Sequence, residues 1–507
     1  MSKTKGQYSL AILTALLLSL NLVSPLADPD LWWHIVIGRW IIFHQSLPQR
    51  DFWNAFSDPQ AIWRAYSWAP EMLFAWVDKG WGVEGLILLK YVLTFLTVGG
   101  ITLCLIQVAA SASAGSIIAL ISLPGLINHL SLRPQVISWL CFAVVFSVAE
   151  LSRRGRVKKN SASIAVFLSA IVWANSNITS AIGLIMLLAW SLPASTKIKQ
   201  LITINNLRLP FLFILGTLCT PYMGGEWLTF SGKAGHPLKL ITISEFAPVT
   251  LYQASALLGL SLALIIYLIR LQSGRKIPIH VNLLPGVFFL GSMLVGKMLP
   301  FALIINAVVL ASIWQEEGSS RSGSILMQNL QVLANKLSKT PSILTIMVAI
   351  LLFLGSSGTA WKTLKTPLND RRILRNEMDY LLKHELPGPI LHSFGSGGYV
   401  LYRLSNTEGT AREKVVIDGR TNVNSAEIMS LANEAYYGTN KWQNYFSKVQ
   451  PNTVVWENNS PLVEILKLHP DWELKFQNKN VASYLLGESG GAVFVRRSAE
   501  NSHERKQ

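Results

Sequence analysis

Charged side chains are scarce in this sequence. Aspartate, glutamate, lysine and arginine together make up 14% of its 507 residues, whereas hydrophobic residues make up 50%. Average soluble domains carry about 25% charged residues. The composition therefore excludes an ordinary soluble domain and indicates an integral membrane protein.

Acidic residues are the scarcer of the two charged classes. The 28 aspartates and glutamates face 44 lysines and arginines, which leaves a formal net charge of +16. In a membrane protein such an excess of lysine and arginine collects in the cytoplasmic loops. The groups of basic residues are also separated by apolar segments. We therefore expect no nucleic-acid partner.

Cysteine is nearly absent as well. Cys104, Cys141 and Cys219 all stand inside apolar segments, and no CxxC pair occurs. This excludes a disulfide framework, a cysteine-based zinc site and a thiol redox site, and it predicts small buried side chains. Gly395-x-Gly397-Gly398 lacks the spacing of a dinucleotide-binding loop, so we predict a turn there.

Long hydrophobic runs are what the sequence has in abundance, and they predict a polytopic helix bundle of about 11 spans. Residues 8–26 follow Lys3 and Lys5 without a clear cleavage site, so we interpret them as an uncleaved first span. Several later runs are shorter than the roughly 20 residues that a straight span needs. The later runs are 83–107, 114–128, 135–151, 161–174, 178–194, 209–222, 250–270, 282–296, 298–314 and 342–360.

The distribution of lysine and arginine predicts the orientation. The densest cluster, Arg153–Lys159, and smaller groups near 197–208, 270–276 and 321–339 fall in alternate loops. By the positive-inside rule these loops and the N-terminus are cytoplasmic. The loop 27–82 and the tail 361–507 are then extracytoplasmic. We expect a transmembrane domain over 1–360 and a second domain over 361–507.

After residue 360 the sequence becomes mixed and charged, as is typical of a globular domain. Helices are predicted over 369–385, 426–437, 440–449 and 460–468, the last with Ser460 as N-cap. Strands are predicted over 389–394, 414–418, 452–456, 472–476, 482–486 and 492–495, with a turn over 395–399. The fold class is thus mainly α, a membrane helix bundle with a C-terminal α/β domain.

Two carboxylates, Asp28 and Asp30, directly follow the first apolar run, and tryptophans are dense behind them. They could be solvated loop acids next to an aromatic belt at the membrane surface. Alternatively, aromatic faces and carboxylates together hold a sugar ring, and a carboxylate can accept a proton from a hydroxyl. The candidate residues of this loop are Asp28, Asp30, Trp32, Trp33, His34, Asp51, Trp68 and Glu71. Between them, Ile35–Phe43 is too short to span and is predicted to lie in the interface plane, with Arg39 and His44 on its wet side.

Three further residues stand at extracytoplasmic ends of apolar runs. Arg133 and Lys297 could extend to lipid headgroups, or could clamp the phosphate of a lipid-linked donor. Glu245 marks either a structural turn or the lining of an active-site cavity shared with Arg133 and Lys297. In the tail, Asp418-Gly419-Arg420 predicts either an ion-paired corner or side chains that face that cavity.

These residues give the chain a resemblance to bacterial membrane proteins of the GT-C glycosyltransferase superfold. The motifs that carry it are Asp28-Pro-Asp30-Leu-Trp32-Trp33-His34, Leu47-Pro48 with Asp51, Tyr66-Ser-Trp68 with Glu71, Leu132-Arg133-Pro134-Gln135, Trp173-Ala-Asn175, Thr220-Pro221-Tyr222, Glu245-Phe-Ala-Pro248, Gly397-Gly398-Tyr399 and Asp418-Gly419-Arg420. Two positions depart from the pattern of such proteins: Asn177 stands near an expected histidine, and Lys297 replaces an expected arginine.

The resemblance implies transfer of a sugar from a polyprenyl-phosphate donor to an envelope lipid, glycan or protein on the outer side of the bacterial inner membrane. It implies that Asp28 or Asp30 acts as the base, and that Arg133 and Lys297 hold the leaving phosphate. A divalent metal, Mg or Mn, held by the two aspartates is an open expectation. The alternatives are a non-catalytic scaffold or flippase-like subunit, and a polymerase or ligase of lipid-linked glycan.

Overall fold

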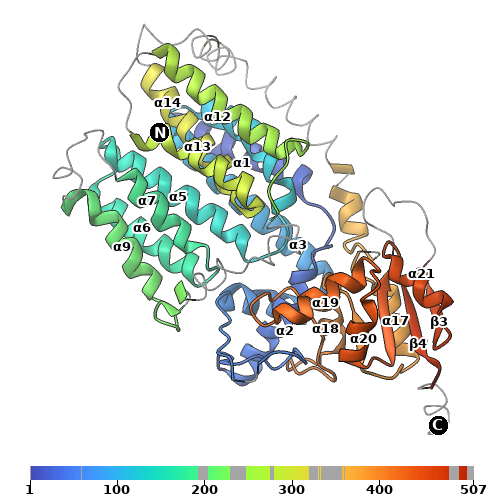
Figure 1. Ribbon diagram of the computed structural model, residues 1–507. Coiled ribbons are helices and arrows are strands. Elements are labelled where there is room, and N and C mark those ends of the chain that lie inside the picture. Colours follow the sequence, from blue (N-terminus) through green and yellow to red (C-terminus); the bar gives the residue numbers. More distant parts are fainter. Residues whose placement is uncertain are drawn as a thin grey trace. The chain divides into compact units, whose positions relative to one another are not determined.

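The computed structural model describes most of the chain (Figure 1). The described residues are 2–191, 204–228, 247–273, 279–318, 357–478 and 490–498, apart from single gaps at 59, 226, 359 and 371, together with residues 329 and 332. The predicted span over 342–360, the predicted strand over 482–486 and the candidate Glu245 therefore lie wholly or largely outside the described residues.

The chain divides into two compact units, and each is built from segments that are far apart in the sequence. The first unit, called here the helical unit, comprises residues 1–24 and 88–365. The second, called here the mixed unit, comprises residues 25–87 and 366–507. The loop that carries Asp28 and Asp30 thus folds together with the C-terminal residues. The assignment of 1–360 to a membrane domain and of 361–507 to an extracytoplasmic domain stays a prediction.

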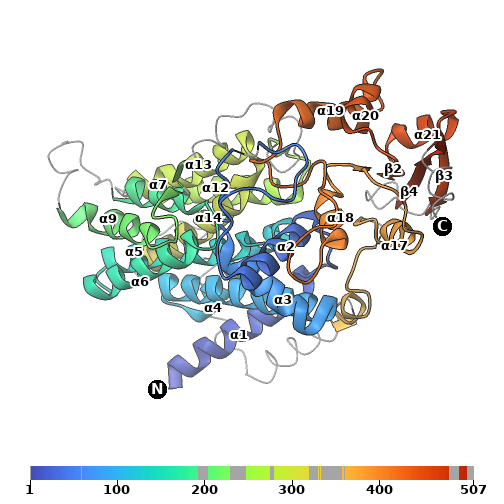
Figure 2. The ribbon, with the colours of Figure 1, turned by 90° about the horizontal axis from the view of Figure 1, so that it is seen from below.

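The helical unit consists of packed apolar helices. Helices α5, α6, α7 and α9 lie side by side, and α12 and α13 pack on α14 (Figures 1 and 2). Helix α14 is apolar all round, and every residue from Phe301 to Ile313 is buried, as expected for the centre of a bundle. The bounds are α1 (Ser2–Leu22), α4 (Ala112–Ser122), η1 (Leu123–His129), α5 (Gln135–Arg153), α6 (Lys159–Ala174), α7 (Ser180–Trp190), α9 (Ile204–Leu218), α12 (Ala254–Ser273), α13 (Ile279–Leu294), η2 (Gly296–Met298) and α14 (Leu299–Gly318).

Four helical segments among the described residues are long and apolar enough to cross a membrane: 68–109, 112–129, 135–153 and 296–315. Six other apolar helices have 10–17 residues, less than a straight span needs. The structure therefore supports a multi-pass membrane protein, whereas the expected count of 11 spans is not confirmed.

A buried carboxylate joins the ends of three of these helices. Glu150 of α5 accepts hydrogen bonds from Arg153 and Arg154 on its own helix, at 2.6–2.9 Å. It also accepts from the Ser312 hydroxyl of α14 at 2.9 Å and from the Trp190 indole of α7 at 3.3 Å. A buried charge is tolerated when it is paired and hydrogen-bonded in this way.

The mixed unit contains a four-stranded sheet with strand order β1-β2-β4-β3. Strands β1 and β2 are parallel, with Leu391 opposite Val454, and the other two pairs are antiparallel. The tail is thus the small α/β structure that the alternating pattern predicted. The bounds are α2 (Pro29–His44), α17 (Arg375–Lys383), β1 (Ile390–His392), α18 (Gly397–Leu404), α19 (Ala426–Tyr436), α20 (Trp442–Val449), β2 (Thr453–Glu457), α21 (Pro461–Leu468), β3 (Trp472–Gln477) and β4 (Gly491–Arg496).

Helix α3 (Trp68–Ala109) begins in the mixed unit and continues into the helical unit. Gly82 interrupts it with φ 59° and ψ −146°, a conformation that glycine adopts without a steric penalty. Two helices therefore meet at this glycine.

Two local predictions in the mixed unit were wrong in part or in whole. Residues 395–399 were predicted as a turn; Gly395 and Ser396 form one, but Gly397 begins helix α18. Residues 414–418 were predicted as a strand, but only an isolated bridge from Val415 to Asn54 forms there.

The apolar stretch 35–43 belongs to the longer α2, whose residues 31–38 are all buried in the mixed unit. His44 at the end of this helix is exposed. The position of this stretch in the membrane interface stays a prediction.

Candidate functional site

The start of helix α2 is defined by the two aspartates. Asp28 is the N-cap residue, with φ −80° and ψ 120°, and its Oδ1 accepts a hydrogen bond from the backbone N–H of Asp30 at 2.9 Å. Pro29 occupies the first helical position, where its missing N–H costs nothing. The Asp-Pro-Asp spacing is thus a local signal for a helix start, and it places Asp30 in the first turn.

Asp30 is held by its own helix and by a distant loop. Its Oδ1 accepts a hydrogen bond from Trp33 Nε1 at 3.1 Å. A Cβ built on Gly419 would collide with the same Oδ1 and would lie 3.1 Å from Trp33 Nε1. The absence of a side chain at Gly419 therefore makes room for the Asp30 carboxylate, which remains partly exposed.

A second glycine approaches the same helix start. A Cβ on Gly398 would collide with the carbonyl oxygen of Pro29 and would lie 3.3 Å from Trp33 Cδ1. Helices α2 and α18 pack against each other along their length. Two tail motifs that stand about 370 and 390 residues after Asp28 thus converge on its helix.

The aromatic residues after Asp30 are core residues of the mixed unit. Trp32 is 1% exposed and packs between Tyr399 and Tyr402, with ring centroids 4.9 Å from each. Trp33 is 5% exposed and its ring lies 3.5 Å from that of His34. These side chains fix the position of α2.

Glu71 holds His34 inside the mixed unit. His34 Nδ1 lies 2.8 Å from Glu71 Oε1, and the two side chains are 4% and 1% exposed. A Cβ on Gly38 would collide with the backbone carbonyl of Glu71, so α2 and the first part of α3 are in backbone contact there. A buried ion pair or hydrogen bond of this kind requires both partners, because removal of one leaves the other buried and unsatisfied.

Asp51 belongs to a buried cluster around Arg420. The Arg420 guanidinium bonds Asp51 Oδ1 at 2.5 Å and Asp418 at 2.5–3.0 Å, and all three side chains are at most 3% exposed. The rings of Trp53 and Trp63 lie 5.4 and 5.5 Å from the guanidinium carbon, at cation–π distance. The predicted ion pair within Asp418-Gly419-Arg420 is confirmed, and Asp51 completes it.

The charges in this cluster change the pKa values of Asp51 and Arg420. Burial by itself would raise the pKa of Asp51, but the charge of Arg420 and hydrogen bonds from Ser57, Asn54 and Arg420 outweigh it and lower that pKa. Burial by itself would lower the pKa of Arg420, but Asp418 and Asp51 raise it. Asp51 and Arg420 are therefore both ionised at neutral pH.

Sequence reasoning missed two polar connections that join the same segments. Asn54 Nδ2 donates to Asn424 Oδ1 at 2.8 Å, and Asn424 Nδ2 donates to the carbonyl of Asp418 at 2.6 Å. Neither asparagine stands in a motif, and no local pattern marks them.

The second missed connection involves Arg39, Asp78 and Tyr402. Arg39 bonds Asp78 Oδ2 at 2.6 Å and lies 4.6 Å over the Tyr402 ring, while the Tyr402 hydroxyl donates to Asp78 Oδ1 at 3.0 Å. Burial, followed by the charge of Asp78, raises the pKa of Tyr402, so the phenol stays protonated and can donate. Arg39 is therefore held by two residues of the same unit, and its side chain is 16% exposed.

The remaining candidates belong to other elements or stand outside the described residues. Trp68 is partly exposed at the start of α3, in the mixed unit. Arg133 is 9% exposed just before α5, and Lys297 lies in η2; both belong to the helical unit. Their role as a phosphate clamp, like the catalytic role of the aspartates, stays a prediction.

The divalent metal expected at Asp28 and Asp30 depends on which side chains could bind it. Among the described residues, no group of three or more His, Cys, Asp or Glu side chains could hold a metal ion. Asp28 and Asp30 alone would supply two carboxylates, and one oxygen of each already accepts a hydrogen bond. A divalent metal held by these two aspartates stays an open expectation.

No protein-family model and no curated protein matches this chain. Solved structures do match. The archaeal oligosaccharyltransferase AglB from Archaeoglobus fulgidus, in complex with an inhibitory peptide and a dolichol-phosphate, has a TM-score of 0.53 at 11% identity, covering 90% of this chain and 70% of that chain. An Archaeoglobus fulgidus oligosaccharyltransferase in the apo form has a TM-score of 0.53 at 11% identity, over 89% of this chain and 69% of that chain.

A mycobacterial arabinofuranosyltransferase, AftD, is more distant, with a TM-score of 0.47 at 13% identity over 96% of this chain and 41% of that chain. The oligosaccharyltransferase likeness extends over both units and is a likeness of fold. The resemblance to the GT-C superfold is confirmed at that level.

Proposed function

We propose that the protein is a membrane glycosyltransferase, and that Asp30 is the carboxylate that activates the acceptor. The observation that carries this proposal is the placement of Asp30. It is partly exposed in the first turn of α2, and two tail motifs converge on that helix start. A fold like that of an oligosaccharyltransferase supports the reaction class but does not establish it.

In the proposed reaction a polyprenyl-phosphate-linked sugar is the donor. The acceptor hydroxyl oxygen forms a bond to the anomeric carbon while the bond from that carbon to the phosphate oxygen breaks. Asp30 takes the hydroxyl proton, and the polyprenyl phosphate leaves with the bonding electrons. The configuration at the anomeric carbon is inverted.

Asp28 has a different role in this proposal. Its Oδ1 caps α2 by accepting from the Asp30 N–H, so it fixes the helix start on which Asp30 stands. Trp33 and Gly419 then set where the Asp30 carboxylate points. Arg133 and Lys297 remain the proposed ligands of the leaving phosphate, because cations stabilise the charge that develops there.

We also propose that the mixed unit faces the extracytoplasmic side of a bacterial inner membrane, with the N-terminus in the cytoplasm. The acceptor is then an envelope lipid, glycan or protein. This orientation follows the distribution of lysine and arginine among the loops.

The test compares Asp30→Asn, Asp28→Asn and Asp58→Asn in the full-length protein. Sugar transfer from a polyprenyl-phosphate donor is measured in vesicles. Loss of a positioned base lowers the rate by about 10²–10⁴-fold, so Asp30→Asn should fall into this range. Asp58 is an exposed acid of the same loop whose side chain accepts only from the backbone of Gln60 in the described structure, so Asp58→Asn is the matched control.

Full transfer activity in both Asp30→Asn and Asp28→Asn would refute the catalytic proposal and favour a non-catalytic scaffold. Activity lost in Asp28→Asn but kept in Asp30→Asn would transfer the role of the base to Asp28.

A further inference from the structure

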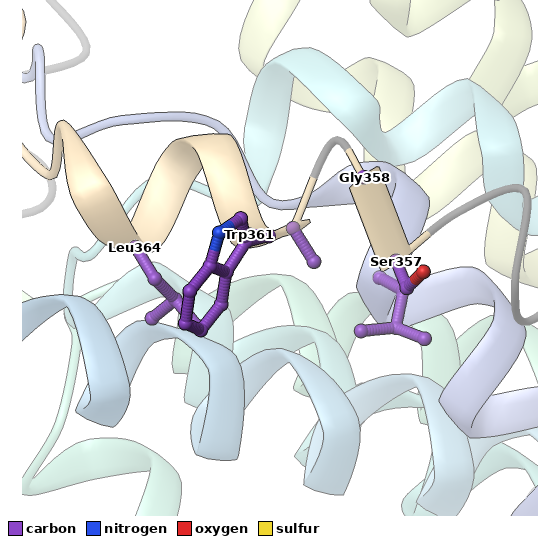
Figure 3. Close-up of a pocket in the computed structure, with 6 residues that line it drawn as sticks. Ser357, Gly358, Trp361 and Leu364 are labelled. Carbon is purple, nitrogen blue, oxygen red and sulfur yellow. The ribbon is translucent and has the colours of Figure 1, made fainter.

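An apolar groove lies on the helical unit, between the end of α1 and the helical residues that precede the mixed unit. It has a volume of about 410 Å³. Figure 3 shows the side chains of Trp361 and Leu364 lying along it, with Ser357 and Gly358 at its other end. The lining is almost wholly apolar and consists of Leu20, Ser357, Gly358, Ala360, Trp361 and Leu364.

Hydrogen bonds connect the lining of the groove to α3. The Tyr91 hydroxyl lies 3.5 Å from the carbonyl oxygen of Ala360, which is 5% exposed. Ser24 stands four residues after Leu20. The Lys90 ammonium donates hydrogen bonds to the Ser24 carbonyl oxygen at 2.7 Å and to the Ser24 hydroxyl at 3.2 Å. The segments on both sides of the groove are therefore hydrogen-bonded to Lys90 and Tyr91, which are neighbours in α3.

An exposed apolar stripe leads from the groove along α1. Ile12 is 52% exposed and Leu16 is 38% exposed, and Leu20 follows at the same spacing of four residues. Residues four apart lie on one face of a helix. Over eight residues this face extends about 12 Å, at 1.5 Å per residue. A hydrocarbon chain seated in the groove could therefore continue along α1.

Two lysines are next to lining residues of the groove in the sequence. Lys362 and Lys365 are exposed on the same helical stretch as Trp361, and Lys365 Nζ lies 5.3 Å from the centre of the Trp361 ring. Trp361 is 62% exposed, as is usual for a tryptophan at headgroup level. No aspartate or glutamate occurs in the sequence between residues 318 and 369, so this stretch of the chain carries net positive charge.

We propose that this groove binds an anionic phospholipid of the surrounding membrane, with one acyl chain in the groove and the phosphate near Lys362 and Lys365. The apolar lining supplies the site for the chain, and the two lysines supply charge complementarity for the headgroup. This site does not depend on the proposed transferase activity.

The test titrates purified full-length protein with phosphatidylglycerol or phosphatidylcholine and counts retained lipids by native mass spectrometry. Each lysine near an anionic headgroup contributes about a five-fold preference, so the wild-type protein should retain its first phosphatidylglycerol about 25-fold more tightly than phosphatidylcholine. The double variant Lys362→Gln/Lys365→Gln should lose this preference.

A second variant fills the groove. A Cβ on Gly358 meets nothing within 4 Å, so Gly358→Phe adds a side chain without a backbone clash and should displace the retained lipid. Gly80 also has open space around its Cβ but lies in the mixed unit, so Gly80→Phe is the matched control and should bind as the wild type does.

Three results would overturn the proposal. They are equal retention of the two lipids by the wild type, unchanged phosphatidylglycerol binding in Gly358→Phe, and displacement of phosphatidylglycerol by an equimolar polyprenyl phosphate. The last result would assign the groove to a lipid-linked donor instead of a membrane phospholipid.

Discussion

Replacement of Arg420 by methionine should destabilise the mixed unit strongly. Arg420 is almost fully buried between the carboxylates of Asp51 and Asp418, which are 3% and 0% exposed. Methionine would fill much of the volume and leave both carboxylates without their cation. Breaking a buried ion pair in this way costs about 3–5 kcal/mol. In a unit of roughly 200 residues, 1 kcal/mol shifts Tm by about 2–4 °C, so a fall of about 6–20 °C is expected.

The matched control is Arg375→Met in the same unit. Arg375 pairs with Asp370 at 3.3 Å, but the two side chains are 45% and 44% exposed. Exposed pairs contribute about 0–1 kcal/mol, so this variant should lose only a few degrees. Thermal unfolding in detergent gives Tm, and hydrogen exchange of strands β1 and β2 shows whether the loss belongs to the mixed unit.

The pH dependence provides a second readout. In the wild type the pKa of Asp51 is lowered below its usual 3.8, so its contribution to stability is complete above about pH 4 and is lost as the pH falls further. Without Arg420 the buried Asp51 carboxylate loses the charge that lowers its pKa, and acid can then neutralise it. The gap in Tm between wild type and Arg420→Met should therefore narrow from pH 7.5 to pH 5. A constant gap, or an equal loss in Arg375→Met, would refute the reasoning.

Three further predictions concern helix α2 and the sheet. Gly419→Ala should push the Asp30 carboxylate aside and lower sugar transfer by about 10²-fold in a folded protein, whereas Gly80→Ala, whose Cβ meets open space, should keep wild-type activity in the same vesicle assay. Asp28→Ser should retain the N-cap bond and Asp28→Ala should lose it, which costs about 1 kcal/mol and should appear as a Tm about 2–4 °C lower; equal Tm values would contradict the capping role. Burial lowers the pKa of His392, so its contribution to stability is complete above pH 6.5, the usual pKa of histidine, and should fall as the pH drops below that value. His392→Gln should reduce this loss of stability in acid, measured as Tm against pH. An unchanged slope of Tm against pH would contradict the role of His392.

Local features of the sequence predicted part of the candidate site. Asp28 was expected to be a loop acid, yet aspartate followed by proline is a helix-start signal whose physics lies within three residues, and the structure has the cap there. Asp418 and Arg420 are only two residues apart, so their ion pair could be predicted without knowledge of the fold. The shortage of charge predicted a membrane protein, because hydropathy depends on composition and not on topology.

Local features failed where packing outweighed intrinsic preference. Glycine is a poor helix former, which favoured a turn at Gly397, yet helix α18 begins there. A Cβ on Gly397 would collide with the carbonyl oxygen of Ile417, and one on Gly398 would collide with that of Pro29. These glycines permit two backbones to touch, and no sequence window contains both partners.

The sequence by itself indicated a membrane protein, and it contained the local signals for the cap at Asp28 and for the ion pair of Asp418 with Arg420. Only the tertiary structure decided that Asp51 completes this ion pair across 369 residues of sequence, and that Gly419 lies against Asp30. The reason is physical: hydropathy, caps and near-neighbour charges act within a few residues, whereas burial of a charge depends on which distant segments fold around it.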